Sequence, residues 1–317
     1  NAAATSQSNN TASFNDASAP TIASTSINTA NTELTITFSE SVYDTTGGTG
    51  DLEVADFALS ISGGVATLGS ATPTSITKTS QSVWVLGFST TGTANGSETI
   101  TVVPASSTSI YDAAANAAAT SQSNNTASFN DASAPTIAST SINTANTELT
   151  ITFSESVYDT TGGTGDLEVA DFALSISGGV ATLGSATPTS ITKTSQSVWV
   201  LGFSTTGTAN GSETITVVPA SSTSIYDAAA NAAATSQSNN TASFNDASAP
   251  TIASTSINTA NTELTITFSE SVYDTTGGTG DLEVADFALS ISGGVATLGS
   301  ATPTSITKTS QSVWVLG

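Results

Sequence analysis

The sequence predicts an all-β protein made of tandem antiparallel sandwiches. Three observations predict it: short runs in which apolar and polar residues alternate, turns rich in Gly, Asn, Ser and Thr between these runs, and repetition of the whole pattern along the chain. Alternation with period two is typical of strands that bury one face. Helix signals are almost missing, because the one Ala-rich stretch, 112–119, lacks an apolar face at helical spacing.

The chain of 317 residues is one unit repeated. The segment that starts at Asn1 recurs, residue for residue, at Asn116 and Asn231, so the period is 115 residues. That period is too long for a solenoid repeat and matches an independent domain. Pro20 cannot continue strand pairing, so a linker is expected in the small, polar run 16–20. The predicted divisions are the terminal strand of a preceding module (1–16), a module (17–131), an identical module (132–246) and a truncated module (247–317).

The truncation falls within the strand that contains the last Trp. We therefore expect that residues 247–317 cannot close a core by themselves, and that the sequence is part of a longer chain.

About seven strands are expected in each module. The run 33–39 shows the pattern most clearly, since it places Leu34, Ile36 and Phe38 on one face and threonines on the other. Similar inward rows follow, made of Phe57, Leu59 and Ile61, of Trp84, Leu86 and Phe88, of Ile100 and Val102, and of Ala12 with Phe14 in the closing strand. In chain order the strands are expected at 20–27, 33–39, 57–62, 65–79, 82–88, 98–103 and 120–129.

This count depends on treating 65–79 as one strand bent at Pro73. Modules strung end to end must receive and release the chain at opposite poles, which requires an odd number of strands. Seven antiparallel strands in two layers predict an immunoglobulin-like sandwich.

The composition excludes several classes of function. There are 25 acidic residues against 3 Lys, so the net charge is −22, and nucleic-acid binding is excluded because it needs clustered cations. Without Cys or His, thiol catalysis, His acid–base catalysis and Zn or Cu sites with N or S ligands are excluded too. The sequence contains no run of about 18 apolar residues, so no membrane-spanning helix is predicted. Paired carboxylates are found in glycosidases, but identical repeats without an evident pocket predict that the chain is not an enzyme.

Four motifs in order carry a resemblance that covers essentially the whole period: Ala-Pro-Thr at 19–21, Thr-Phe-Ser-Glu at 37–40, Asp-Phe at 56–57, and Ile-Tyr-Asp at 110–112 with Asn116 nearby. With this order and spacing, the chain resembles the tandem bacterial Ig-like repeats of giant cell-surface proteins and adhesins. The family usually has Gly before the Asn of its last loop, where this chain has Ala115. The resemblance implies an extracellular spacer or filament module, often stabilised by calcium.

Seven of the nine acids in each module are expected to gather at the inter-module junction. The second strand returns to the N-terminal pole, so Glu40 and the loop 41–56 lie there, and the sixth strand brings Asp112 to the same pole. Asp16 lies in the linker itself. Clustered carboxylates repel one another, and Ca²⁺ relieves this repulsion by taking six to eight oxygen ligands. The alternative is that the acids are solvated and keep a Ser/Thr-rich surface soluble, with Na⁺ or Mg²⁺ as loose counterions.

The favoured ligands are Asp16, Glu40, Asp44 and Asp112, ahead of Asp51, Glu53 and Asp56. Over all copies, the predicted calcium ligands are Asp16, Glu40, Asp44, Asp51, Asp56, Asp112, Asp131, Glu155, Asp159, Asp166, Asp171, Asp227, Asp246, Glu270, Asp274, Asp281 and Asp286.

Two other residues have simpler interpretations. Trp84 is expected in the core rather than in a sugar-binding platform. Lys78, the one cation of each module, is expected to guard an edge strand, and an intramolecular cross-link to Asn or Asp is the less favoured alternative.

The predicted function is that of a structural extender or filament-forming segment of a long bacterial surface protein, with neighbouring modules of the same chain as partners. Exact copying favours this, because reach grows with copy number. The alternative is a multivalent glycan- or cell-binding adhesin module. Self-assembly into filaments, in which edge strands of neighbouring chains pair, is a third hypothesis.

Overall fold

The computed structural model describes residue 5 and residues 8–317. It divides into two compact units, one made of the residues up to Ile176 with Leu183–Ser204 and Ile215–Ala242, the other of Ser177–Thr182, Thr205–Thr214 and Ser243–Gly317. The module boundaries given above stay a prediction. Of the predicted strand segment 1–16, residues 1–4 and 6–7 lie outside the described residues.

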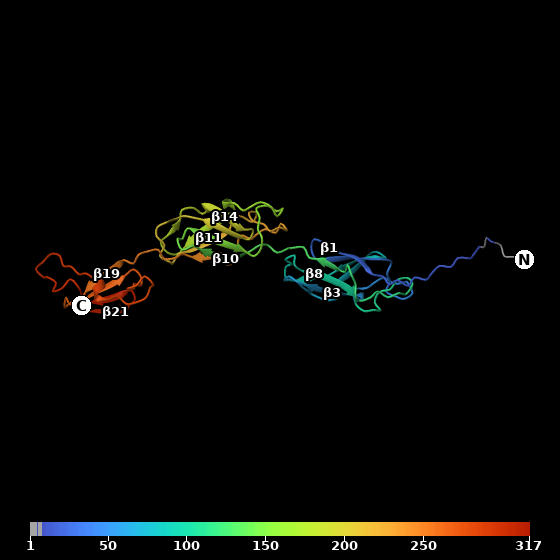
Figure 1. Cartoon of the computed structure of the whole chain (residues 1–317), viewed down its shortest axis with the longest axis horizontal. Helices are drawn as coiled ribbons and strands as arrows, with labels where there is room; N and C mark the ends of the chain where they lie inside the picture. Colours follow the sequence, from blue (N-terminus) through green and yellow to red (C-terminus); the bar gives the residue numbers. More distant parts are fainter. Residues whose placement is uncertain (1–4, 6–7) are drawn as a thin grey trace. The chain divides into compact units, whose positions relative to one another are not determined.

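The module at 17–131 is a two-layer antiparallel sandwich (Figure 1). Its larger sheet has the order β1-β2-β6-β5, and its smaller sheet has the order β3-β8-β9. Four strands facing three in this order is the arrangement of an immunoglobulin constant-type domain, so the predicted fold class is confirmed. The strands are β1 (Ile22–Ile27), β2 (Glu33–Phe38), β6 (Val83–Gly87) and β5 (Ser75–Ser80), and β3 (Phe57–Ser62), β8 (Thr99–Pro104) and β9 (Thr126–Ser128).

The strand expected at 65–79 is wrong. β4 (Thr67–Leu68) pairs with β7 (Thr90–Thr91) in a separate two-stranded ribbon, whereas β5 joins the larger sheet. Between them the chain passes from the ribbon to the larger sheet, and Pro73 in this segment is buried and has no N–H to donate to a neighbouring strand. The expected number of seven therefore fits the two main sheets, but the ribbon is additional.

The core lies between the two sheets, and it is made of the predicted inward rows. Ile36 is opposite Trp84 in the register of β2 and β6, and both side chains are 0–1% exposed. Phe38 and Phe57 join the two layers with ring centroids 6.4 Å apart. Phe129, just after β9, packs edge-on against Phe88 at 5.9 Å and closes the far end.

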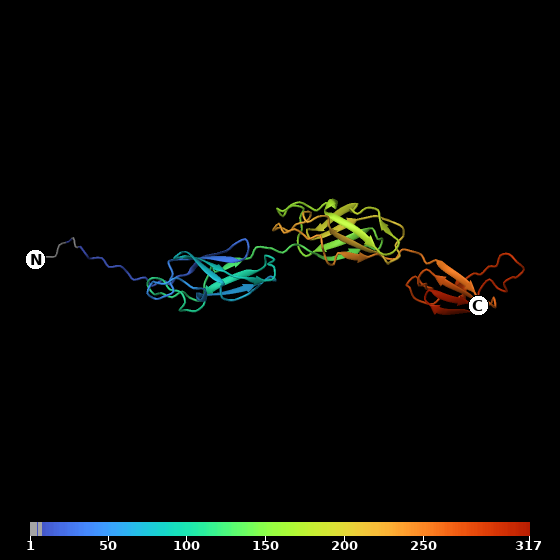
Figure 2. The same cartoon turned by 180° about the vertical axis from the view of Figure 1, so that it is seen from behind.

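Loops gather at the two ends of the strands of this module (Figure 2). The near pole holds the end of β2, the 3₁₀-helix η1 (Val54–Asp56) and the segment after β8; the far pole holds the turns after β1 and β3 and the loop before β8.

The second copy repeats the same pairings. Its elements are β10 (Ile137–Ile142), β11 (Glu148–Phe153), η2 (Val169–Asp171), β12 (Phe172–Ser177), β13 (Thr182–Leu183), β14 (Ser190–Ser195), β15 (Val198–Gly202), β16 (Thr205–Thr206), β17 (Thr214–Pro219) and β18 (Thr241–Ser243).

The third copy forms the larger sheet alone, in the order β19-β20-β22-β21. Residues 287–292, the counterpart of β3, are not a strand, and an apolar cavity of about 900 Å³ opens beside Leu264 and Leu316. This agrees with the expected open core. Its elements are β19 (Ile252–Ile257), β20 (Leu264–Phe268), η3 (Val284–Asp286), β21 (Ile306–Ser310) and β22 (Val313–Leu316).

Residues 8–16 contain no strand, and Phe14 is fully exposed, so the expectation that Ala12 and Phe14 belong to a closing strand is wrong for this copy. Their counterparts Ala127 and Phe129 are held by the pairing of β9 with β8. The residues described before Phe14 offer no such partner. Among the described residues, there is no helix with the length and apolarity needed to cross a bilayer.

Replacing Ile36 with Ala should destabilise the first module by about 2–5 kcal/mol, since it empties a fully buried site against Trp84. The measurement is urea unfolding followed by the fluorescence of Trp84, with Trp199 and Trp314 replaced by Phe. Val65→Ala, at a side chain that is 62% exposed, is the control and should change stability by less than about 0.5 kcal/mol. Equal effects of the two variants would contradict the assigned core.

Candidate metal centre

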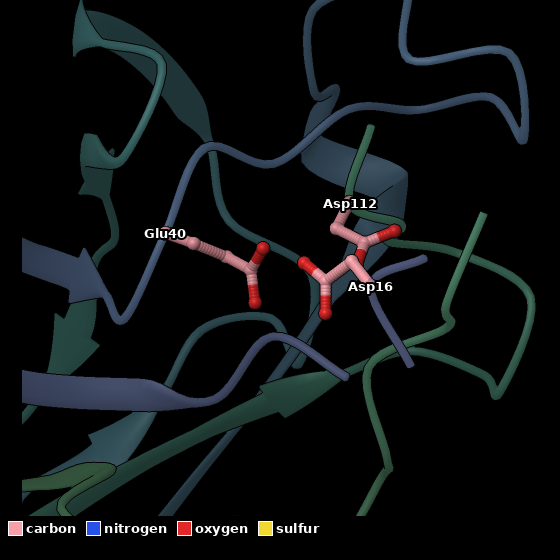
Figure 3. A group of neighbouring side chains, drawn as sticks. All are labelled: Asp16, Glu40 and Asp112. Carbon is pink, nitrogen blue, oxygen red and sulfur yellow. The ribbon is translucent and has the colours of Figure 1, made fainter. Parts of the chain in front are cut away.

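Three carboxylates meet at the near pole of the first module. The carboxylate oxygens of Asp16, Glu40 and Asp112 lie within 4.8 Å of one another. They come from the linker before β1, the turn after β2 and the loop after β8, so residues far apart in sequence are brought together by the sandwich. The Glu40 side chain extends toward the other two (Figure 3).

Asp112 is the fixed member of this cluster. It is 1% exposed, and its Oδ1 accepts hydrogen bonds from the N–H groups of Ala114 (2.9 Å) and Asn116 (2.7 Å). The side-chain amide of Asn116 donates to Oδ2 at 2.7 Å. Amide donors of this kind stabilise an ionised carboxylate. The loop therefore holds a negative charge in place at the inner edge of the pole.

Asp16 is held through its backbone and its own turn. Its carbonyl oxygen accepts a hydrogen bond from the side-chain amide of Asn116 at 3.2 Å, and its Oδ1 accepts from the N–H of Ser18 at 2.9 Å. Asn116 thus ties the linker to the loop of Asp112.

Glu40 is the member of this cluster whose charged form is disfavoured by its surroundings. Burial, and then the negative charges of Asp112 and Asp16, raise the pKa of the Glu40 carboxyl above its ordinary value. Repulsion that raises a pKa is relieved either by a proton or by a cation. The cluster is therefore a place where positive charge is favoured.

The second copy repeats this arrangement with Asp131, Glu155 and Asp227, again within 4.8 Å of one another. Asp227 is fully buried and accepts from the N–H groups of Ala229 and Asn231 at 2.9 and 2.7 Å. Burial, followed by the charges of Asp131 and Asp227, raises the pKa of Glu155 to about 7. Glu155 therefore binds a proton more readily than an ordinary Glu when no cation is bound.

The third copy has two of the three carboxylates. Burial and a side-chain hydrogen bond with Asp246 raise the pKa of Glu270. Residues 247–317 contain no counterpart of Asp112.

The other predicted ligands take part in different interactions. Asp51 and its copies Asp166 and Asp281 form ion pairs with Lys78, Lys193 and Lys308, whose ammonium groups lie 5.6–5.7 Å from the Trp ring centroids. Lys78 lies on β5, an edge strand, as expected.

Asp56 and Asp171 cap the 3₁₀-helices, accepting from the N–H groups of Glu53 and Glu168 at 2.7 Å, and Asp286 repeats this with Glu283. Asp44, whose carboxylate is near Gly50, and its copies Asp159 and Asp274 lie in the Gly-rich loops. The three-carboxylate groups found among the described residues do not include these side chains.

The donor set fits a hard divalent cation. All three side chains offer carboxylate oxygens, which suit Ca²⁺ and Mg²⁺ rather than Zn²⁺ or Cu²⁺. The single Lys of the module is paired with Asp51, so it does not neutralise the cluster. Three carboxylates supply part of the six to eight oxygens that Ca²⁺ takes, with backbone carbonyls and water as the remaining donors.

Sequence reasoning missed Glu98 and Glu213, which are not among the acids predicted to gather at the junction. Both are 0% exposed. Burial raises the pKa of Glu98, but hydrogen bonds from backbone N–H groups outweigh it and the pKa is lowered overall. The signal in the sequence is indirect: the pair Gly63-Gly64 leaves room for the side chain of Glu98, because a Cβ on Gly64 would overlap Cδ of Glu98.

Comparison with known proteins finds matches among solved structures but no family. No protein-family model matches the chain, and neither does any curated protein. The N-terminal part of the bacterial S-layer protein SbsC matches at 19% identity and a TM-score of 0.27, over 63% of this chain and 40% of that one. A titin I-band fragment matches at 10% identity and a TM-score of 0.28, over 95% of this chain and 88% of that one. Domains 1–6 of SbsC match at 12% identity and a TM-score of 0.27, over 95% and 63%.

This chain thus spans less than half of the first of these structures. At such identities and TM-scores the likeness carries no functional argument, and the assignment of the fold depends on the strand order.

Ala115→Gly should stabilise the first module by about 0.5–1 kcal/mol. Ala115 has φ of 73°, a left-handed conformation that costs an L residue about 1–2 kcal/mol, and only part of the relief is offset by the greater chain entropy of Gly. Urea unfolding measures the change. Ala114→Gly is the matched control in the same loop, and since Ala114 has no positive φ it should destabilise by about 0.5–1 kcal/mol. The same sign for both would contradict the strain.

The metal-free chain should be more stable at pH 5 than at pH 8. The pKa of Glu155 is about 7 in the folded state against 4.5 when unfolded, so the folded state binds this proton more tightly. The stability that protonation of Glu155 contributes is fully present below about pH 4.5 and is lost as the pH rises through 7. Glu40 and Glu270, whose pKa values are also raised, act in the same direction.

Melting temperatures in chelator over pH 5–8 measure this effect. Glu155→Gln should flatten the profile, whereas Glu148→Gln, at an exposed residue of β11, should leave it unchanged. A profile that Glu155→Gln does not alter would contradict the raised pKa.

Proposed function

We propose that this chain is a structural extender in a long extracellular protein of a bacterial cell surface, with Ca²⁺ bound at the near pole of each module. One observation carries the proposal: the same three-carboxylate cluster recurs in both complete copies, and one of its members belongs to the linker that enters the module. A cation held there would fix the linker to the sandwich.

The identical copies support a mechanical role. A spacer gains reach with every added module, whereas a catalytic site gains nothing in specificity from being copied without change. The sandwich fold is suited to this role, because antiparallel strands distribute load over many backbone hydrogen bonds. The resemblance to bacterial Ig-like surface repeats agrees with a location outside the cell.

The number of carboxylates in the cluster is consistent with an extracellular calcium site. Extracellular Ca²⁺-binding modules work with weak sites, with Kd values of about 10⁻⁴–10⁻³ M. Three carboxylates with few other protein ligands fit a site of this strength.

Calcium should stabilise the chain, and a chelator should remove the effect. At a free Ca²⁺ concentration of about 100 times Kd, one site adds about 2.7 kcal/mol to the free energy of unfolding of its module. Differential scanning calorimetry with Ca²⁺ and with chelator measures this. Glu155→Gln removes one ligand that has no role in the buried loop, so it should abolish the increment of the second module, and Glu148→Gln should retain it.

Unchanged melting temperatures with and without calcium would contradict the calcium part of the proposal while leaving the spacer part in place. The spacer part has its own measurement: small-angle scattering of this chain and of a chain lengthened by one 115-residue copy. The maximum dimension should grow by about 40 Å per added module, the length of a strand of about 23 Å with its loops and linker. No growth would contradict an extender.

A further inference from the structure

The far pole of the first module is organised around a buried carboxylate that the acidic cluster does not use. Glu98 Oε1 accepts hydrogen bonds from the N–H groups of Val65 (2.7 Å) and Ala66 (2.9 Å), and its Oε2 accepts from the N–H of Asn95 (3.0 Å). The backbone N–H of Phe129 donates to the Glu98 carbonyl at 3.0 Å. One side chain thus fixes the turn after β3, and its residue joins the loop 92–98 to the end of β9.

This loop contacts the linker that leaves the module. The N–H of Ala132 donates to the carbonyl of Ala94 at 2.9 Å, and the hydroxyl of Ser133 donates to the same oxygen at 3.0 Å. Asn95 and Asp131 form an isolated antiparallel bridge. A Cβ on Gly96, which has φ of 76°, would lie 3.2 Å from Cβ of Asp131. The linker therefore lies against the loop through three consecutive positions, 131–133, rather than running free.

The carboxylate of Asp131 belongs to the cluster with Glu155 and Asp227. One residue thus has its backbone against the preceding module and its side chain in the site of the following one. Asp16 provides an internal comparison with Asp131. The two residues have the same sequence neighbours, but no counterpart of the loop 92–98 lies among the residues described before Asp16. Asp16 is exposed, whereas Asp131 is half-buried.

The same arrangement recurs in the next copy, within the second compact unit. The N–H of Ala247 and the hydroxyl of Ser248 donate to the carbonyl of Ala209 at 2.9 and 3.0 Å, and Asn210 forms a bridge with Asp246. A cavity of about 460 Å³ there is lined by Asp246 and Glu270 as well as by the loop. The two copies, which have the same sequence, thus form the same contact.

We propose that residues 94–96 of the loop 92–98 are a docking surface for the linker 131–133, and that Glu98 is their positioning residue. The acidic site of one module is thereby coupled to the fold of the module before it, since Asp131 contacts both. Two sites that share a positioned element bias each other reciprocally. The cation part of this coupling rests on the proposed function, whereas the docking of the linker does not.

Hydrogen exchange of the full chain without metal tests the docking. Ala17 and Ala132 have identical sequence neighbours, so their intrinsic exchange rates are equal. The amide of Ala132 should exchange about ten-fold or more slowly than that of Ala17, as expected for one net hydrogen bond. NMR on a segmentally labelled chain separates the copies. Equal rates would overturn the proposal.

Two glycines of the loop provide a matched pair of variants. Gly96→Ala places a methyl group against Asp131, so it should raise the exchange rate of Ala132 to that of Ala17. Gly92→Ala introduces the same left-handed strain at φ of 85°, but its methyl group faces the carbonyl of Val65, 3.2 Å away, and Ala132 should stay protected. If Gly96→Ala leaves Ala132 protected, or both variants act alike, the docking surface is wrong.

Glu98→Gln tests the positioning role. The amide group replaces one acceptor oxygen with a donor, so Ala132 should lose protection while Ala118, bonded to the carbonyl of Ile110 at the near pole, keeps it. Unchanged protection of Ala132 would overturn the role of Glu98. If the Glu98→Gln module does not fold, Glu98→Asp replaces it, and the same comparison of Ala132 with Ala118 decides.

Calcium titration calorimetry tests the coupling. In the full chain with Glu40→Gln and Glu270→Gln, which keep only the second cluster intact, Gly96→Ala should weaken Ca²⁺ binding about five-fold or more. With Glu155→Gln and Glu270→Gln, which keep the first cluster, it should have no effect. Equal affinities in the first background would overturn the coupling. If the unmodified chain binds no Ca²⁺, the proposed function fails and the coupling with it, and the exchange experiment still decides the docking.

Discussion

Burial of negative charge against backbone N–H groups is the constraint on which the rest of this structure depends. Each module has one Lys, so its buried carboxylates are satisfied by amides rather than by cations. Asp112 organises the near pole in this way, and Glu98 organises the far pole. Both groups fix loops rather than strands, and the loops decide where the linkers lie. The Phe, Ile, Leu and Trp core makes the sandwich, but the carboxylates give it two defined ends.

The fold could be predicted because its signals are local. Alternation in 33–39 and around Trp84 gives the facing rows of the core directly, and repetition gives the module. The strand 65–79 could not be predicted correctly, because its two halves, β4 and β5, have similar short polar patterns and are assigned to different sheets only by their partners. Likewise, the run containing Phe14 has the same sequence as the closing strand β9. Only β9 forms a strand, because it pairs with β8.

The candidate site could be predicted in part. Topology alone brings Glu40 and Asp112 to one pole, so these members of the cluster follow from strand order. Topology does not say which acids at a pole have partners other than the cluster. Asp51 forms an ion pair with Lys78 and Asp56 caps a short helix, and both contacts depend on the course of the loop 41–56. Glu98 was missed because its partners are backbone amides, which leave no mark in the pattern of side-chain types.

Identical copies carry a consequence for recovery after stretching. β8 pairs with β9 through Thr126, Ala127 and Ser128, and each complete copy contains the same residues. When adjacent modules are pulled open together, a relaxing β8 meets two chemically indistinguishable versions of its partner. Nothing in β8 itself favours the partner from its own module, so correct refolding depends on sequence separation alone. Exchange of strands between neighbouring modules is therefore the misfolding error that this chain favours most.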